Sequence, residues 1–386
     1  LQEDEYEILE EFKGEQLVGL EYQPLISSYK DLTEMQNAEG LYKLYATDYV
    51  EVTEGTSLVT INGAYGEIDM EAANKLNLPI VMDVEMDGTF NEKNPTYQSR
   101  YIKDAEPDLL KDMQESGFVW RKEKYKHSYP HCWRCDCQLM NYATSSWFVK
   151  IDAIKKQMLE NNAKVNWTPK HVGEGRFAQW LENARDWCIS RNRFWGTPLP
   201  VWIAEDGDMI CISSIQELEQ LTGETVTDLH KHKIDHLTIQ KDGKTYTRTE
   251  EVFDCWFESG SMPYAQYHYP YENKEEFDQN FPAEFISEGL DQTRGWFYTL
   301  TVLGTALFGK SPFKNVIVNG MILAEDGKKM SKRLKNYPEP SHVFDNYGAD
   351  ALRFYLLSSP LVKSEPIRFS EKGVEDVLKR VILPLW

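Results

Sequence analysis

The order of hydrophobic and polar positions predicts a chain of mixed helices and strands. Apolar runs at residues 18–22, 41–45 and 57–61, each bounded by Gly, Pro or acidic residues, predict short β-strands. The spacing of apolar residues over 68–76 and 109–116 predicts helices. We therefore expect the first third of the chain to be a mixed α/β region.

The middle of the chain is predicted to be mainly helical. Helices are expected at about 152–161 and 173–187, because apolar residues from Phe177 to Ala184 recur with a helical period. The segment Ser214-Ile-Gln-Glu217 is a capping box, which predicts a helix that runs to Leu221. Residues 222–249 then turn polar and include His230, His232 and His236. A surface insertion is expected there rather than a metal site.

Strand and helix patterns alternate in the last third. An apolar helix is predicted at about 293–308 and a strand at 315–319, followed by helices near 348–358 and 371–383. Such alternation is typical of an α/β sheet.

Composition narrows the class of protein. The 386 residues carry a formal net charge of −20, so non-specific attraction to a polyanion is disfavoured and any nucleic-acid contact must use locally basic surface. Hydrophobic residues make up 41%, and no run of 18 apolar residues predicts a membrane-spanning helix. The 6 cysteines favour a reducing cytoplasm over a disulfide framework. Because the chain starts at Leu1 and stops at Trp386 in an apolar run, we expect a piece of a longer protein.

The strongest chemical signal is a basic, Gly-containing loop after the strand at 315–319. Residues 309–335 hold 7 Lys or Arg against 2 acids. Lys329 and Lys332, with Ser331 between them, suit a triphosphate whose charge shifts in a transition state. The alternative is an ordinary solvated loop.

The string Lys329-Met-Ser-Lys-Arg333 resembles the second signature of class I aminoacyl-tRNA synthetases. Residues 285–297 resemble the segment that holds the aminoacyl-adenylate in the isoleucyl branch of that family. The resemblance implies roles in binding substrate and adenylate for a set of residues in and around these segments: Glu288, Gly289, Asp291, Gln292, Trp256, Trp296 and Asn319. Of these, Trp256 and Trp296 would wall an apolar pocket; the alternative is that both are core residues.

Residues 186–202 resemble a segment shared by the isoleucyl, valyl and leucyl enzymes. The resemblance suggests that Arg191 and Arg193 face tRNA phosphates or the mouth of the active site. The alternative is an arginine-anchored helix end packed by Trp195.

Cys132 and Cys135 have the C-x-x-C spacing of one half of a tetrahedral zinc site. No second C-x-x-C occurs in the chain, so the resemblance implies that a partner pair lies earlier in the whole protein. Zn²⁺ is therefore expected only in the full-length protein.

Residues 1–126 resemble the editing insertion of the isoleucyl enzymes. Asp69 falls on the carboxylate that grips the amino group of a mischarged residue, although a helix N-terminal acid is the alternative. Where the family has His-Thr-Ala-Pro, this chain has Thr60-Ile-Asn-Gly63, so the histidine is missing. The editing architecture is expected, while hydrolytic activity is left open.

Together these resemblances imply an ATP- and Mg²⁺-dependent, monomeric, cytoplasmic ligase that joins isoleucine to tRNA(Ile), with possible editing of Val-tRNA(Ile). The expected fold is the second half of a Rossmann-like catalytic domain plus a mixed α/β editing insertion. No H-x-G-H element occurs, so these residues alone should not activate isoleucine. A valyl enzyme and a degenerate binding protein are the alternatives.

The resemblance also implies four regions along the chain. Residues 1–126 would be the editing domain, and residues 127–250 the return to the catalytic domain with the Cys turn and the surface insertion. Residues 251–366 would be the catalytic half with the lysine-rich loop, and residues 367–386 the start of the anticodon-binding helices.

Overall fold

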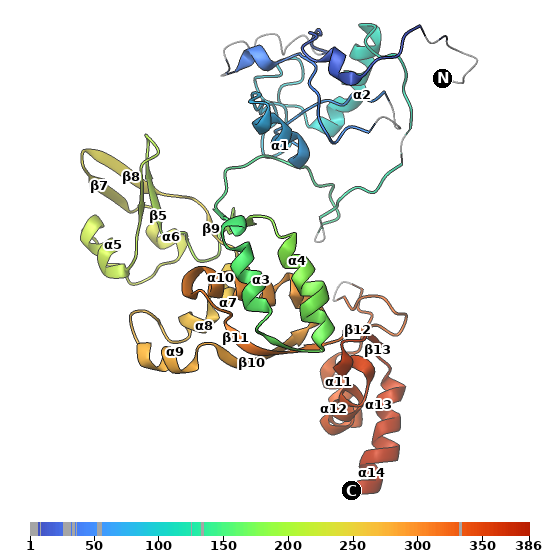
Figure 1. Cartoon of the computed structure of the whole chain (residues 1–386), viewed down its shortest axis with the longest axis vertical. Coiled ribbons are helices and arrows are strands. Elements are labelled where there is room, and N and C mark those ends of the chain that lie inside the picture. The colour runs from blue at the N-terminus through green and yellow to red at the C-terminus, as the bar shows by residue number, and fades with distance from the viewer. Residues whose placement is uncertain are drawn as a thin grey trace. The chain divides into compact units, whose positions relative to one another are not determined.

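The computed structural model describes residues 7, 9–25, 32, 35, 37–51, 56–124, 126–132, 135–331 and 334–386. The chain divides into two units, residues 1–145 and 146–386 (Figure 1). Both helices and strands are present, which confirms the predicted α/β class. In the part of the chain that the structure describes, no helix has both the length and the apolar character needed to cross a membrane.

Among its described residues, the first unit has two α-helices, two short 3-10 helices and long irregular segments. Helix α1 (Glu67–Lys75) confirms the helix predicted at 68–76, and α2 (Ile102–Glu115) begins earlier than the pattern indicated. The strands predicted at 18–22, 41–45 and 57–61 are wrong, because the described residues of these runs form only one isolated bridge, Glu21 to Lys43. Their apolar side chains have no sheet to pack against, and Leu20 is 53% exposed.

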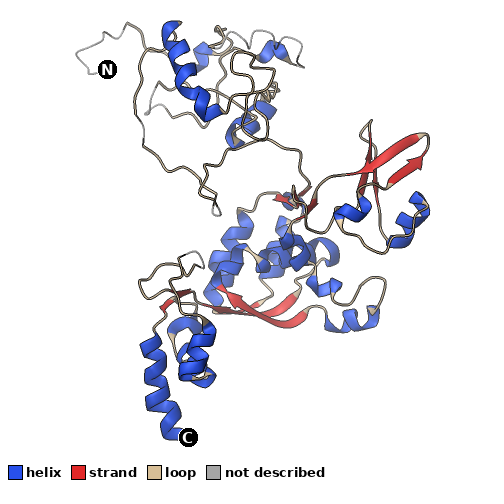
Figure 2. Ribbon diagram, turned by 180° about the vertical axis from the view of Figure 1, so that it is seen from behind, coloured by secondary structure: helices blue, strands red, loops and turns tan. Residues whose placement is uncertain are grey.

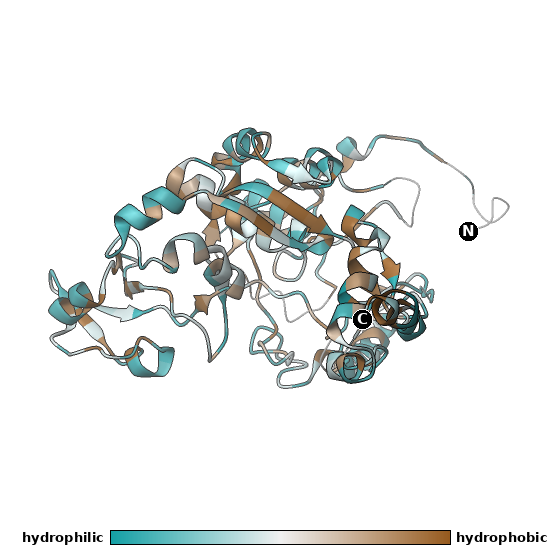
Figure 3. Ribbon diagram, turned by 90° about the horizontal axis from the view of Figure 1, so that it is seen from below, coloured by the Kyte–Doolittle hydropathy of each residue, from teal (hydrophilic) through white to brown (hydrophobic). Residues whose placement is uncertain are grey.

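A parallel sheet forms the centre of the second unit. Its order is β10 (Ala283–Gly289), β11 (Phe313–Asn319) and β2 (Asn166–Thr168), with Gly289 opposite Asn319. Helices α3 (Lys155–Asn162), α4 (Ala178–Glu182) and α10 (Trp296–Phe308) lie on one face of it (Figure 2). Figure 3 shows the sheet from below, with hydrophobic and hydrophilic stretches along its strands.

The strand pattern explains this one-sided packing. Ile286, Val316 and Val318 point into a core with Phe297 and Leu300 of α10, while the intervening Phe285 and Ile317 are exposed. Alternation of this kind covers one sheet face only. Because α10 is apolar on all sides, it is buried along most of its length, as its sequence predicted.

Residues 201–248 fold as a small antiparallel module in the order β6-β5-β8-β7. Residues 222–249 were expected to be a polar surface insertion, yet they supply half of this sheet. Ile239 and Tyr246 are buried against Trp202 and Leu218, because the two residues pair across neighbouring strands and so lie on the same face of the sheet. The Ser214 cap is confirmed: its side chain accepts a hydrogen bond from the Glu217 backbone N–H at the start of α5.

The remaining elements complete the second unit. Helices 348–358 and 371–383 are confirmed by α12 and by α13, which continues through a π-turn into α14. The other elements are β1 (Phe148–Val149), β3 (Trp187–Cys188), β4 (Ser190–Arg191), β5 (Val201–Ala204), β6 (Met209–Cys211), α5 (Ile215–Thr222), α6 (Lys231–Ile234), β7 (Thr238–Lys241), β8 (Lys244–Arg248), β9 (Val252–Phe253), α7 (Cys255–Gly260), α8 (Met262–Ala265), α9 (Lys274–Asn280), β12 (Ile322–Leu323), α11 (Pro340–Tyr347), α12 (Ala349–Leu357), β13 (Ile367–Arg368), α13 (Glu371–Val377) and α14 (Leu383–Leu385).

Candidate active site

The carboxyl ends of β10 and β11 lie side by side and carry most of the predicted site residues. Gly289 pairs with Asn319 at this edge, and the Asn319 side-chain amide donates to the Ser287 hydroxyl at 3.5 Å. The carboxylates of Glu288 and Asp291 are exposed here. In open α/β sheets, ligands bind outside the carboxyl ends of the strands. We call Glu288, Gly289 and Asp291 the acidic shelf.

Close backbone approach explains the glycine of the acidic shelf. A Cβ at Gly289 would lie 2.8 Å from Oδ1 of Asp291, so any larger residue would displace that carboxylate. The glycine therefore lets Asp291 fold back over the end of β10.

The Gln292 side chain is used inside the protein. Its Oε1 accepts a hydrogen bond of 2.9 Å from the Trp296 backbone N–H, which caps the start of α10. The resemblance gave Gln292 a role in binding the adenylate. In this geometry its Oε1 is occupied by the cap, and its NH₂ group is the part left to face a ligand.

Trp256 and Trp296 converge beside this cap. Trp296 donates its indole N–H to the Ser259 carbonyl at 3.0 Å and packs against the core. Trp256 is 40% exposed, and its Cη2 would lie 3.2 Å from a Cβ on Gly295. Of the two indoles, Trp256 is the one with free surface to meet an apolar side chain.

The basic loop emerges from the same edge, directly after β11. Leu323 and Lys329 pair as an antiparallel bridge, and Gly327 takes the turn with a φ of +81°. A hydrogen bond from the Lys328 backbone N–H lowers the pKa of the Asp326 carboxyl in this turn. We call residues 324–336 the lysine loop. Lys329 is exposed, and Lys332 lies outside the described residues.

Two residues that sequence reasoning missed hold this loop. The Asn336 side chain accepts from the Ser331 N–H at 2.9 Å and donates to the Lys329 carbonyl at 3.1 Å. Arg368 of β13 lies under the turn, where a Cβ on Gly327 would be 3.0 Å from its Nε. Asn336 follows the motif directly, but nothing in the sequence connects Arg368 with a loop about 40 residues earlier.

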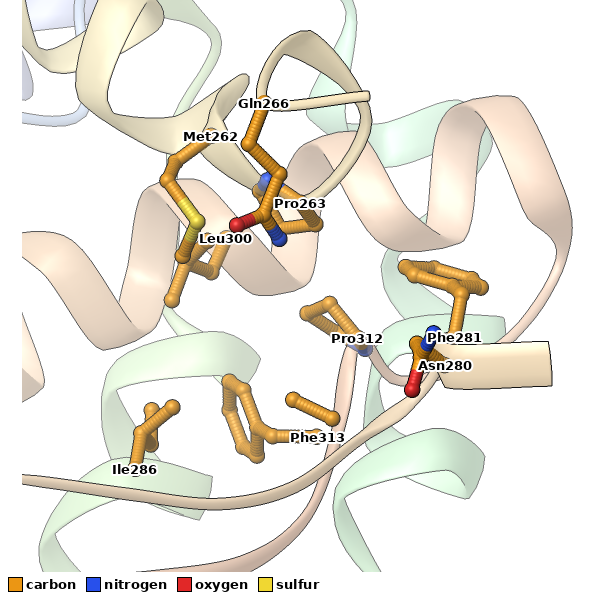
Figure 4. Close-up of a pocket in the computed structure, with 10 residues that line it drawn as sticks. Met262, Pro263, Gln266, Asn280, Phe281, Ile286, Leu300, Pro312 and Phe313 are labelled. Carbon is orange, nitrogen blue, oxygen red and sulfur yellow. The ribbon is translucent and has the colours of Figure 1, made fainter. Parts of the chain in front are cut away.

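A small cavity lined by described residues lies at the ends of the strands opposite the acidic shelf. It measures about 30 Å³, and it is lined by Met262, Phe281, Leu300 and Phe313 among others (Figure 4). That volume holds roughly one water molecule. Because β10 and β11 begin here, the cavity is separate from the acidic shelf and the lysine loop.

Comparison with protein families identifies the family of this chain. A family model for tRNA synthetases class I (I, L, M and V) matches residues 2–368. The chain belongs to this family.

Class I synthetases of known specificity include close relatives of this chain. It is 52% identical over 382 residues to the isoleucine–tRNA ligases of Chlamydia caviae, Chlamydia abortus and Chlamydia pneumoniae. These matches cover 99% of this chain but 36% of each relative. The chain therefore spans about a third of the length of these class I relatives.

Similar solved structures are more distant. A ternary LeuRS–tRNA–LeuAMS complex from Agrobacterium radiobacter K84 has a TM-score of 0.41 at 21% identity and covers 53% of this chain and 30% of that chain. A Mycobacterium tuberculosis methionyl-tRNA synthetase with methionyl-adenylate has a TM-score of 0.45 at 14% identity, covering 82% of this chain and 55% of that chain.

The two arginines predicted to bind tRNA differ in their surroundings. Arg191 is held by the buried Asp254 at 2.9 Å, and it also donates to the carbonyls of Cys188 and Ser190 at 2.9 Å and 2.7 Å. Arg193 is exposed. Arg191 is therefore engaged by groups of the protein itself, whereas the Arg193 side chain is exposed to solvent.

Of the two cysteines with the C-x-x-C spacing, Cys132 is half-buried and Cys135 is exposed. The Cys132 N–H donates to the Cys137 carbonyl at 2.8 Å, and the Cys137 thiol faces the Cys135 carbonyl at 3.8 Å. Structural zinc takes four ligands. Among the described residues no three His, Cys, Asp or Glu side chains converge, so the donor set of this chain does not fit a complete zinc site.

The predicted editing residues lie in the first unit. Asp69 is half-buried in the first turn of α1, where a Cβ on Gly66 would be 2.7 Å from its Oδ2. Burial raises the pKa of the nearby Tyr49 hydroxyl, and the charge of Asp69 raises it further. Thr60 is exposed in an irregular segment, and no described contact joins it to Asp69.

Proposed function

We propose that this chain is part of an isoleucine–tRNA ligase. The enzyme would join isoleucine to ATP as an adenylate, release pyrophosphate and pass the isoleucyl group to tRNA(Ile). The observation that carries the proposal is the pairing of Gly289 with Asn319, because it makes the acidic shelf and the lysine loop leave one edge of one sheet. The 52% identity to isoleucine–tRNA ligases supports isoleucine as the amino acid.

Adenylate formation needs alignment and charge stabilisation rather than a covalent enzyme intermediate. The isoleucine carboxylate attacks the α-phosphorus of ATP, and the bond to the pyrophosphate oxygen breaks. Negative charge builds on the leaving pyrophosphate, and ammonium groups fixed near it lower the barrier. We assign this role to Lys329 with Ser331, and from the sequence motif to Lys332.

The acidic shelf and the tryptophans would hold the rest of the adenylate. Glu288 and Asp291 offer acceptors to the isoleucine ammonium group or to ribose hydroxyls, and Gly289 admits the ligand close to the backbone. Trp256 presents an exposed indole to the isoleucine side chain, with Trp296 fixed behind it. Asn319 and the free NH₂ of Gln292 complete the polar rim.

We assign Mg²⁺ to the phosphates of ATP. No three carboxylate, His or Cys side chains converge in the described parts of the chain to hold it separately. Zn²⁺ at Cys132 and Cys135, a cytoplasmic location and a monomeric state remain proposals that rest on the sequence resemblance.

Editing is a second proposed activity of the full-length protein. One extra methylene distinguishes isoleucine from valine, which a pocket resolves by only about 1–3 kcal/mol. We propose that Asp69 grips the amino group of a mischarged residue, and from the sequence resemblance we also assign Thr60 to the editing site. Deacylation of Val-tRNA(Ile) by the full-length protein, compared with an Asp69→Ala variant, tests this role.

The decisive experiment is amino-acid-dependent ATP–pyrophosphate exchange by the full-length protein, with isoleucine and valine compared. We expect exchange with isoleucine at much lower concentration than with valine. Preference for valine would replace the proposal with a valyl enzyme, and no exchange with either would indicate a degenerate binding protein. The isolated 386 residues should show none, because they contain no H-x-G-H element.

A further inference from the structure

Two neighbouring aromatic residues stand out of the second unit and are stacked by histidines. Phe194 is 71% exposed and Trp195 is 65% exposed. The Trp195 ring stacks on His230 with centroids 4.4 Å apart at 28°, and the Phe194 ring stacks on His232 at 6.0 Å and 22°. We call these four residues the aromatic platform.

The loop that presents the platform is fixed at its base. The Thr197 backbone N–H donates to the Glu258 carboxylate at 3.1 Å, and its carbonyl accepts from the Phe253 N–H at 2.7 Å. A Cβ at Gly196 would lie 2.9 Å from a methyl group of Val252, which is itself buried. The exposure of the two aromatic rings is therefore built into an anchored loop.

The histidine side of the platform is fixed as well. His230 contacts the Asp228 carboxylate through Nδ1 at 2.5 Å, and Lys231 donates to the Glu250 carbonyl at 2.6 Å. Ile234, one turn further along α6, is buried in the core of the small module. Both imidazoles are thus held against the aromatic rings.

Three cations are adjacent in sequence to residues of the aromatic platform. Arg193, Lys231 and Lys233 adjoin its residues, in a chain whose formal net charge is −20. The two acids of residues 228–236 are already engaged, Asp228 by His230 and Asp235 by the buried Arg248. A ligand that is both flat and anionic fits such a surface.

We propose that the aromatic platform stacks an unpaired base of the RNA that this protein binds, with the flanking cations meeting its phosphates. Unpaired RNA bases stack on aromatic side chains and on histidine, and each such contact is sequence-tolerant. A protein partner is the alternative, but it would not require stacked ring planes beside an excess of cations. The inference rests on the proposed function, which makes tRNA the RNA in question.

The test measures the dissociation constant of tRNA(Ile) for the full-length protein by filter binding. One double variant, Phe194→Leu with Trp195→Leu, keeps apolar bulk but removes stacking. A matched one, Phe194→Tyr with Trp195→Phe, keeps aromatic rings. Thermal unfolding checks that both fold. The leucine pair should weaken binding about 5- to 100-fold, and the aromatic pair should remain within about 3-fold of wild type.

Three outcomes would overturn the inference. They are unchanged tRNA affinity in the leucine pair, equal loss in both pairs, and a fall in particle mass by light scattering without any change in tRNA affinity. The last would mark the platform as a protein contact. Because filter binding needs no catalysis, absence of isoleucine-dependent exchange in the wild type would refute the proposed function while leaving the platform test in force.

Discussion

Arg191 and Asp254 form an ion pair in which the arginine Nη2 lies 2.9 Å from the aspartate Oδ2. The Asp254 side chain is only 5% exposed, and the same carboxylate accepts from the Trp187 indole at 3.3 Å and from the Trp256 N–H at 3.2 Å. Asp254 therefore caps α7 and fixes Trp256 at the second position of this helix. These contacts support the anchoring alternative for Arg191 over a direct tRNA contact.

Replacing Asp254 with Ala should loosen α7 without touching substrate. The change leaves two N–H groups and a guanidinium without their acceptor, which costs about 2–4 kcal/mol of local stability. Amide exchange of a peptide covering residues 255–260, followed by mass spectrometry, should become at least 10-fold faster. Asp254→Asn keeps an acceptor and should show a smaller effect; equal protection in all three proteins would contradict the capping role.

Replacing Lys329 with Ala should lower catalysis more than binding. An ammonium group that meets charge only in the transition state acts on kcat, and removing one such donor costs about 10²- to 10³-fold. The neighbouring Lys328 is the matched control, because its ammonium is exposed and lies 3.5 Å from Asp326. In ATP–pyrophosphate exchange by the full-length protein, Lys328→Ala should stay within about 2-fold. Equal effects would show that only loop charge matters.

Replacing Gly320 with Ala should destabilise the junction between β11 and the C-terminal helices. A Cβ there would lie 1.9 Å from the Glu365 carbonyl oxygen, so backbone must move. We expect a loss of about 2 kcal/mol or more, measured as a lower thermal unfolding midpoint. Gly175→Ala is the control, since its Cβ would meet nothing within 4 Å and the helical position favours Ala. A drop of similar size in the control would contradict the explanation.

Burial raises the pKa of the Tyr298 hydroxyl from 10.0 to about 12, with a further contribution from the charge of Asp186. Between those values the unfolded chain loses this proton while the folded chain keeps it. The stabilisation is therefore complete below about pH 10 and is lost as the pH rises towards 12.

A Tyr298→Phe variant isolates this effect, because other alkaline titrations are common to both proteins. Up to pH 9, raising the pH should change the urea unfolding midpoints of the wild type and the variant by the same amount. From pH 10 to 12 the wild type should lose about 1–2 kcal/mol more than the variant. If the unfolding free energies of the two proteins change in parallel over the whole pH range, the Tyr298 hydroxyl ionises equally in the folded and unfolded states.

The sequence predicted correctly those elements that depend only on residues close together in the chain. The Ser214 cap and the apolar run of α10 determine their own helices, because each depends on residues within one or two turns. The three predicted strands in the first unit failed for the opposite reason, since a strand exists only where a partner lies beside it. The Thr238–Lys241 strand was missed because its alternation was hidden among charged residues.

The candidate site shows the same division. Lys329, Glu288 and Asp291 were found from motifs, each contained in a short segment. Asp254, Arg368 and the close contact at Gly320 were not, because each acts on a residue far away in the sequence. Gln292 was assigned a ligand role from the family resemblance, and its use as a helix cap depends on backbone geometry at Trp296.

The pairing of β12 with β13 gives the lysine loop a fixed root. Ile322 and Ile367 are in register, and the Phe369 N–H donates to the Leu323 carbonyl at 2.9 Å. If the lysine loop moves towards a nucleotide, the chain must then bend after Leu323, within the hairpin that the Leu323–Lys329 bridge forms. The pairing of β12 with β13 therefore connects the C-terminal helices directly to the base of the loop that carries Lys329.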